Sequence, residues 1–207
     1  LGLGLIGGSM ARAYALAGHT VLAYDKDEST LSFAMLSGAV HGLLEENTIA
    51  QCDLILLSIY PGGCAQWLAK NGQFVKKEAL VMDLCGIKQE VCRRCFPVAE
   101  KYGFTFVGGH PMAGSEKTGY ENAKTHLIEN AYYIITPGTG VPEDTVNEFV
   151  ALVSSLKALP LVLDYRQHDF ITACVSHLPH LIASSLVELV KDLDGPEELM
   201  KRIAAGG

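Results

Sequence analysis

Three glycines at the start of the chain limit what it can fold into. Gly2, Gly4 and Gly7 fit the spacing G-x-G-x-x-G, and the small and apolar residues at 10–16 that follow are typical of a helix. Glycines in this position allow a tight turn and a close approach of the backbone to a ligand, and the first turn of the helix offers free N–H groups to an anion. The pattern predicts a loop that binds the pyrophosphate of a dinucleotide, formed by Gly2, Gly4, Leu5, Ile6 and Gly7. The strand that should precede the loop is nearly absent, so we expect the given sequence to begin within that strand.

An acidic residue follows at the position that such a loop requires. Residues 20–24 form an apolar run expected as a strand, and Asp25 ends it, 18 residues beyond Gly7. A carboxylate there accepts hydrogen bonds from the hydroxyls of the adenosine ribose and repels the 2′-phosphate of NADP. The sequence therefore predicts NAD as the cofactor, although Lys26 beside the acid opposes this preference.

Strands and helices alternate along the next part of the chain. We expect further strands at 53–59, 80–84, 104–107, 131–136 and 161–163, and helices at 27–36, 88–101 and 145–157. Strands separated by helices form βαβ units. The sequence thus predicts an α/β fold, a doubly wound and mostly parallel Rossmann-type sheet, over residues 1–165.

Polar residues gather where these strands should end. The run GGHPMAGSEKTG at 108–119 is rich in glycine and contains a proline, so we expect a loop after the strand at 104–107. Ligands bind at this edge of open α/β sheets. His110 is the best acid/base candidate because histidine titrates near neutral pH. Ser58 and Asp83 end two other strands at the same edge and are expected to bind the cofactor beside the nicotinamide.

The pattern of apolar residues changes from residue 166 onward. Apolar residues there surround most of the circumference of a helix, which predicts a helix buried in a bundle or between subunits. Pro179 should kink it, and a further helix is expected at 197–205. We therefore assign residues 166–207 to the start of an all-α helical domain, incomplete in this chain. His177 and His180 are spaced i, i+3 and should share a face, whereas His168 is expected to be structural.

Composition excludes several classes of function. The net charge is −7 and no run of Lys or Arg exceeds two residues, which argues against nucleic-acid binding. Without an uninterrupted apolar run of about 18–20 residues, we expect no membrane-spanning helix. The six cysteines are expected to be cytoplasmic thiols rather than a disulfide framework, and no metal site is predicted.

Four motifs resemble the prephenate dehydrogenase family, which includes arogenate dehydrogenases. They are GLGLIGGS at the start, DLCGIKQ at 83–89, GGHPMAGSEKTG at 108–119, and HD…SHLPHLIASSL from 168 to 186. The resemblance implies NAD-dependent oxidative decarboxylation of prephenate to 4-hydroxyphenylpyruvate in tyrosine biosynthesis, by a homodimer joined through its helical domain. It also implies a catalytic role for His110, and substrate contacts from Ser115, Glu116, His180 and, as the weaker member of its pair, His177.

Two departures from the family pattern bear on the mechanism. Many members have a serine where this chain has Gly86, and its hydroxyl would assist the catalytic histidine. The family's helical domain also continues beyond residue 207, into a segment with an arginine that binds the substrate carboxylate.

Other readings of the sequence stay open. Arogenate differs from prephenate only in a side-chain amino group in place of a keto group. A β-hydroxyacid dehydrogenase of the same architecture would normally use a catalytic lysine on the first helix of the helical domain. This chain has only Lys191 there, near the end of the helix, which disfavours that class. A protein that merely senses NAD would not need His110 and a charged pair beside the nicotinamide.

Overall fold

The computed structural model describes residues 1–204 and divides the chain into two compact units. The first unit is Leu1–His168, and the second begins at Asp169. This division lies close to residue 165, where the sequence places a domain boundary.

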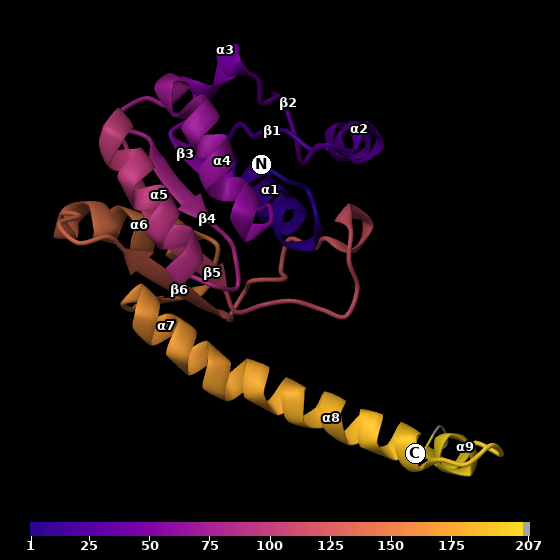
Figure 1. The fold of residues 1–207 in the computed structure, drawn as a ribbon. Coiled ribbons are helices and arrows are strands. Elements are labelled where there is room, and N and C mark those ends of the chain that lie inside the picture. Colours follow the sequence, from indigo (N-terminus) through magenta and orange to yellow (C-terminus); the bar gives the residue numbers. More distant parts are fainter. Residues whose placement is uncertain (205–207) are drawn as a thin grey trace. The chain divides into compact units, whose positions relative to one another are not determined.

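The first unit is built on a five-stranded sheet in the order β3-β4-β5-β6-β7 (Figure 1). Its strands are parallel except for the antiparallel pair β5–β6. A second, two-stranded parallel sheet pairs β1 with β2. The strand bounds are β1 Leu22–Ala23, β2 Gly42–Leu43, β3 Leu54–Leu57, β4 Leu80–Asp83, β5 Thr105–Pro111, β6 Tyr132–Pro137 and β7 Leu159–Val162.

The first two residues join the two sheets. The amino group of Leu1 donates to the carbonyl of Leu56, and the Leu1 carbonyl accepts from the N–H of Ser58, each at 2.8 Å. On the other side, the N–H of Gly2 donates to the carbonyl of Tyr24 at 2.8 Å. Leu1 and Gly2 thus occupy the place of a central strand, and the predicted mostly parallel Rossmann-type architecture is confirmed.

Helices cover both faces of the larger sheet. On one face, apolar side chains of α4 and α5 pack with those of β3, β4 and β5, and on the other, α1 and α6 pack against β4, β5 and β6. The α-helices are α1 Leu5–Leu16, α2 Glu28–Leu36, α3 Glu46–Ile49, α4 Pro61–Asn71, α5 Gln89–Tyr102, α6 Glu143–Ser155, α7 Tyr165–Thr172, α8 Leu178–Leu193 and α9 Leu199–Ala204. Short 3₁₀ turns lie at Gly72–Phe74 and Tyr120–Asn122.

Helix α4 is an element that the sequence reading missed. No helix was predicted between the strands at 53–59 and 80–84, but Pro61 is the first residue of this helix. Proline suits that position because its φ is already helical and the first N–H groups of a helix have no partner within it. The helix therefore begins directly after the pocket-facing end of β3.

The prediction that residues 108–119 form a loop throughout is wrong at its start. Strand β5 continues to Pro111, and Gly108 pairs with Thr136 of β6. The glycines serve close packing here: a Cβ on Gly108 would lie 2.2 Å from Oγ1 of Thr136, and one on Gly109 would lie 2.6 Å from the carbonyl oxygen of Asp83. The loop begins only at Met112.

The second unit is mainly one long helical segment. After α7, residues Ala173–His177 form a π-helical turn, and α8 follows with Pro179 in its first turn. Proline has no N–H for the regular helical hydrogen bond, and π turns are one of the ways in which helices absorb such an interruption. A π turn thus lies just before Pro179, and the predicted kink at Pro179 stays a prediction. Of the predicted helix at 197–205, Ala205 lies outside the described residues.

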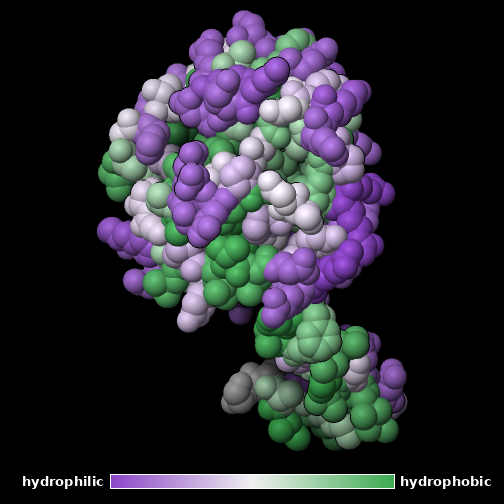
Figure 2. Space-filling model, turned by 90° about the vertical axis from the view of Figure 1, so that its left-hand side faces the viewer, coloured by the Kyte–Doolittle hydropathy of each residue, from purple (hydrophilic) through white to green (hydrophobic). Residues whose placement is uncertain are grey.

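The apolar side chains of α8 are exposed in the single chain. None of its residues is buried, and Figure 2 shows hydrophobic side chains along much of this unit. By length and composition, Tyr165–Leu193 would be able to cross a membrane. Length and composition alone do not establish a membrane span, so the absence of a membrane-spanning helix stays an expectation.

Candidate active site

A pocket of about 1430 Å³ opens at the carboxyl ends of the parallel strands in the first unit. The glycine loop forms one wall, and the ends of β1, β3 and β4 form the floor. The start of α4 and part of the segment between β5 and β6 complete it. Parallel strands direct the loops that follow them to one edge, which is why distant parts of the sequence meet here.

At Gly2 and Gly7, the glycine loop lies too close to neighbouring backbone for a side chain. Gly2 has φ +83°, and a Cβ on it would lie 2.3 Å from the carbonyl oxygen of Ser58. A Cβ on Gly7 would lie 2.0 Å from the carbonyl oxygen of Gly2. Helix α1 begins at Leu5 with Gly4 as its N-cap and without a capping side chain. Its first turn therefore presents N–H groups to the pocket, as pyrophosphate binding requires.

Of the predicted cofactor residues, Gly2, Gly4, Leu5, Ile6, Asp25 and Ser58 line the pocket, and Gly7 supports the loop from behind. The carboxylate of Asp25 accepts from the N–H of Leu3 at 2.6 Å through Oδ2, and from the N–H of Asp27 at 2.9 Å through Oδ1. Asp25 thus also fixes the glycine loop to the end of β1. Each carboxylate oxygen retains a second lone pair for a ligand.

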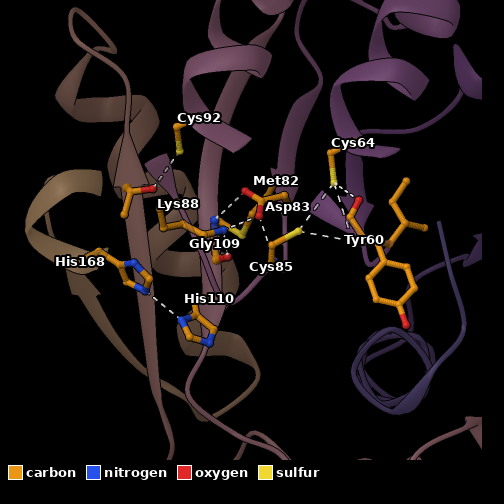
Figure 3. A network of polar contacts seen from close by, with 12 residues as sticks. Tyr60, Cys64, Met82, Asp83, Cys85, Lys88, Cys92, Gly109, His110 and His168 are labelled. Carbon is orange, nitrogen blue, oxygen red and sulfur yellow. Dashed lines mark hydrogen bonds and ion pairs between the residues drawn. The ribbon is translucent and has the colours of Figure 1, made fainter. Parts of the chain in front are cut away.

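His110 lies near the end of β5 and contacts a second histidine. Its Nδ1 is 2.8 Å from Nε2 of His168 in α7, and the two rings meet edge to face with their centroids 5.1 Å apart (Figure 3). His168 is only 1% exposed. One nitrogen of this pair donates and the other accepts, so the contact orients the His110 ring and couples its tautomer to that of His168.

The other ring nitrogen of His110 faces the position of the missing serine. A Cβ on Gly86 would lie 3.7 Å from Nε2 of His110, an ordinary van der Waals distance. Gly86 itself lines the pocket. The glycine therefore leaves space beside Nε2 for a substrate hydroxyl or for water.

Cys85 lines the pocket beside Gly86 but is a poor nucleophile. Its Sγ is 3.8 Å from Sγ of Cys64. The hydrogen bond with Cys64, and then burial, raise the pKa of the Cys85 thiol far above its usual range. Because the thiolate is the reactive form, this thiol stays protonated and inert.

Asp83 lies in the interior of the first unit rather than in the pocket. It is fully buried and forms an ion pair with Lys88, which is also fully buried (Figure 3). Asp83 is not among the residues that line the pocket, and its contact with the cofactor stays a prediction.

The candidate substrate residues are placed unevenly. Ser115 lines the pocket and Glu116, its neighbour in the same segment, does not. The hydroxyl of Ser115 accepts from the N–H of Lys117 at 3.1 Å, which turns the segment back on itself. His177, in the π turn, and His180, in α8, belong to the second unit, where both side chains are exposed.

The sequence reading missed two residues of this region. His168 was expected to be merely structural, and Lys88 was only the first residue of a predicted helix. The signal for His168 lay in the motif that begins with it. Among residues 1–204, no group of three or more His, Cys, Asp or Glu side chains is arranged to hold a metal ion.

Together, a glycine loop that opens a helix, an acid at the end of the next strand and a pocket at the strand ends define a Rossmann-type dinucleotide-binding protein. Comparison with known proteins gives the family. Residues 10–161 match the sequence model of the prephenate dehydrogenase nucleotide-binding domain, and residues 164–207 match that of the prephenate dehydrogenase dimerization domain. The chain belongs to the prephenate dehydrogenase family.

Three relatives illustrate the similarity. The chain is 33% identical to a prephenate dehydrogenase of Bacillus subtilis over 221 aligned residues, covering all of this chain and 57% of that protein. It is 34% identical to one of Lactococcus lactis over 211 residues, with the same two coverages. The structure of prephenate dehydrogenase from Aquifex aeolicus, in complex with hydroxyphenyl propionate and NAD⁺, superposes with a TM-score of 0.85 at 26% identity, covering 97% of this chain and 71% of that one. The chain thus spans just over half the length of the two curated relatives.

Proposed function

We propose that the protein catalyses the NAD-dependent oxidative decarboxylation of prephenate to 4-hydroxyphenylpyruvate, a step of tyrosine biosynthesis. The observation that carries the proposal is the position of His110. One of its ring nitrogens is held by His168, and the other faces Gly86 at the wall of the dinucleotide pocket. Family membership and the NAD⁺-bound relative support the same reaction.

The residues of the pocket fit NAD. The free N–H groups at the start of α1 suit the pyrophosphate, and Asp25 suits the ribose hydroxyls while disfavouring a 2′-phosphate. NAD, when bound, supplies the acceptor for a hydride. The protein holds the substrate and NAD close together in the correct orientation. Such positioning accounts for much of the rate enhancement in enzymatic reactions.

His110 acts as the base in this proposal. With a proton on Nδ1 donated to His168, His110 accepts the proton of the substrate hydroxyl at Nε2 as the adjacent carbon–hydrogen bond breaks. The departing CO₂ leaves its electron pair in the ring, which becomes aromatic, and the ring oxygen regains a proton. His168 stabilises the positive charge that His110 carries meanwhile. General base catalysis of this type contributes about 10²–10⁴-fold.

Ser115, Glu116, His177 and His180 remain candidate substrate contacts, with His180 preferred over His177. The substrate carries two carboxylates, so we expect cationic groups beyond these residues to take part. Lys117, which lines the pocket, is the nearest such group along the same segment.

We also propose that the protein is a cytoplasmic homodimer joined through its helical unit. The exposed apolar side chains of α8 need a cover, and residues 164–207 match a dimerization domain. A second copy of the chain would bury this helix more simply than a membrane would. Sedimentation of the purified protein at micromolar concentration tests the dimer, and fractionation of cells tests the location.

The deciding experiment is the formation of NADH, followed at 340 nm, by the full-length protein with either prephenate or arogenate. We expect turnover with NAD and prephenate. Turnover with arogenate alone would keep the reaction and change the substrate. If neither substrate gives NADH while NAD still binds, the proposal is rejected. Binding is measured independently through the fluorescence of Trp67, the single tryptophan, which lines the pocket.

A further inference from the structure

The backbone N–H and carbonyl of Gly109, which belong to successive peptide groups, both bond to a buried ion pair. The ammonium of Lys88 donates to the carboxylate of Asp83 and, at 2.5 Å, to the carbonyl of Gly109. The N–H of Gly109 donates to Oδ1 of the same aspartate at 3.3 Å. The N–H of Cys85 donates to Oδ2 at 2.9 Å. Figure 3 shows these groups between β4, β5 and the start of α5.

The pair lies where the two parallel strands stop bonding to each other. The pairing of β4 with β5 ends at Met82 and Val107. Two residues further along β5, side chains take over, because the polar atoms of Gly109 bond to Asp83 and Lys88 instead of to a neighbouring backbone. The ion pair thus continues the strand contact beyond the last backbone pairing.

Stability alone is a weak reason for such a pair. Both side chains are fully buried, and removing two charges from water costs about as much as their attraction returns. Apolar residues of the same volume would often stabilise the fold equally well. What they would not provide is a donor for the Gly109 carbonyl and an acceptor for its N–H.

Gly109 directly precedes His110, so its peptide group sets the direction in which the His110 side chain leaves β5. The close approach of Gly109 to the carbonyl oxygen of Asp83, 2.6 Å from an added Cβ, leaves no room for another residue. From the other side, β6 pairs with His110 through Ile134. The ion pair, the strand β6 and His168 therefore fix the histidine from three directions.

We propose that Asp83 and Lys88 are positioning residues for His110, acting through the backbone N–H and carbonyl of Gly109, and not ligands of the cofactor. The proposal rests on the catalytic role of His110 proposed above. It assigns to the DLCGIKQ motif the task of holding the catalytic histidine of another motif in place.

The test compares three variants of the full-length protein: Asp83→Asn, Lys88→Met and the double variant. Each single change leaves one charge buried without its partner, so both are expected to lower Tm. The double variant removes both charges together and should recover much of the lost Tm. We expect its kcat to stay about 10²-fold below that of the wild type, since small misplacements of a catalytic group cost this much. The Kd for NADH, measured through Trp67, should stay within about threefold of wild type because the pair does not line the pocket.

Lys76→Met serves as the matched control, because Lys76 forms an ion pair with Asp53 that is largely exposed. It should change neither Tm nor kcat appreciably. If the double variant recovers kcat together with Tm, the ion pair is structural only and the proposal is overturned. A large loss of NADH affinity in the double variant would instead indicate that Asp83 binds the cofactor. That result would overturn the proposal as well.

A measurement without turnover separates this proposal from the proposed reaction. The imidazole nitrogens of ¹⁵N-histidine-labelled protein report the tautomer and order of each ring. In the double variant we expect the His110 signals to shift or broaden, and those of the exposed His19 and His126 to stay in place. Unchanged His110 signals would refute the positioning role even if the wild type oxidised neither prephenate nor arogenate.

Discussion

Nδ1 of His110 lies 2.8 Å from Nε2 of His168, although the two residues are 58 positions apart in the sequence. His110 lies near the end of β5, and His168 lies within α7. The buried His168 orients the half-buried ring of His110, whose Nε2 faces Gly86. This arrangement makes the chemistry of the site testable residue by residue.

Replacing His110 tests the base directly. In His110→Asn we expect kcat to fall by about 10²-fold or more, roughly 2.7 kcal/mol of barrier, because asparagine cannot take the hydroxyl proton. The affinity for NADH should not change, since the pyrophosphate and ribose contacts lie elsewhere in the pocket. Steady-state kinetics and Trp67 fluorescence measure the two effects. Unchanged turnover would remove His110 from the mechanism.

Replacing His168 should cost less than replacing His110. In His168→Ala the ring of His110 loses its orienting hydrogen bond, so we expect kcat to fall by about tenfold, or ~1.4 kcal/mol, and the pH profile of kcat to shift. The KM for NAD should stay constant. The control is His126→Gln, at an exposed position. A loss of kcat accompanied by an unaltered pH profile would show that His168 only supports the fold.

The choice of cofactor should depend on Asp25. In Asp25→Ser, the negative charge is lost together with the carboxylate oxygen that accepts from the N–H of Leu3. We expect the preference for NAD over NADP, as a ratio of kcat/KM values, to fall by about tenfold, or ~1.4 kcal/mol. Asp53→Ser, which alters an exposed carboxylate outside the pocket, is the control. An identical ratio in both variants would contradict the assignment.

Gly86 offers a gain-of-function test. A side chain fits there without a clash, because its Cβ would lie 3.7 Å from Nε2 of His110. In Gly86→Ser the new hydroxyl should hydrogen-bond to that histidine and raise kcat by about two- to tenfold, the value of one hydrogen bond of ~0.5–1.4 kcal/mol. Gly86→Ala separates the hydroxyl from the added carbon and should show no gain. If the two variants behave alike, the hydroxyl has no role.

The pH dependence of stability should reflect the N-cap of α2. Hydrogen bonds from the hydroxyls of Thr30 and Ser29, and from the Ser29 N–H, hold the pKa of Asp27 below its ordinary value of 3.8. A lowered pKa in the folded state stabilises the protein above that ordinary value, and the benefit is lost as the pH falls through the folded-state pKa. Asp27→Ala should therefore lower Tm at about pH 7, and the difference from wild type should shrink toward about pH 3.

Thermal unfolding followed by circular dichroism measures this effect. Asp144→Ala alters an acid in the first turn of α6 that is not the N-cap and should show little pH dependence. A difference in Tm for Asp27→Ala that stays constant with pH would mean that the cap does not depend on ionisation.

Local patterns in the sequence were enough for most of the architecture. The glycine spacing, the acid at 25 and the alternation of apolar runs depend on short-range physics: turn geometry, helix ends and side-chain periodicity. They predicted the Rossmann-type sheet and the edge at which its pocket opens. Composition failed at Gly108–Pro111, where pairing with β6 makes a strand out of residues that alone favour a loop.

Only the tertiary structure decided how the site is held together. Nothing in the local sequence shows that Lys88 reaches Gly109, that Asp83 faces inward, or that His168 contacts His110. These contacts join residues 21 to 58 positions apart. Their partners are selected by the packing of α5 and α7 against the sheet, and a one-dimensional pattern does not encode which side chains that packing brings within hydrogen-bonding distance. The sequence by itself determined which chemical groups are available, and the fold determined which of them meet.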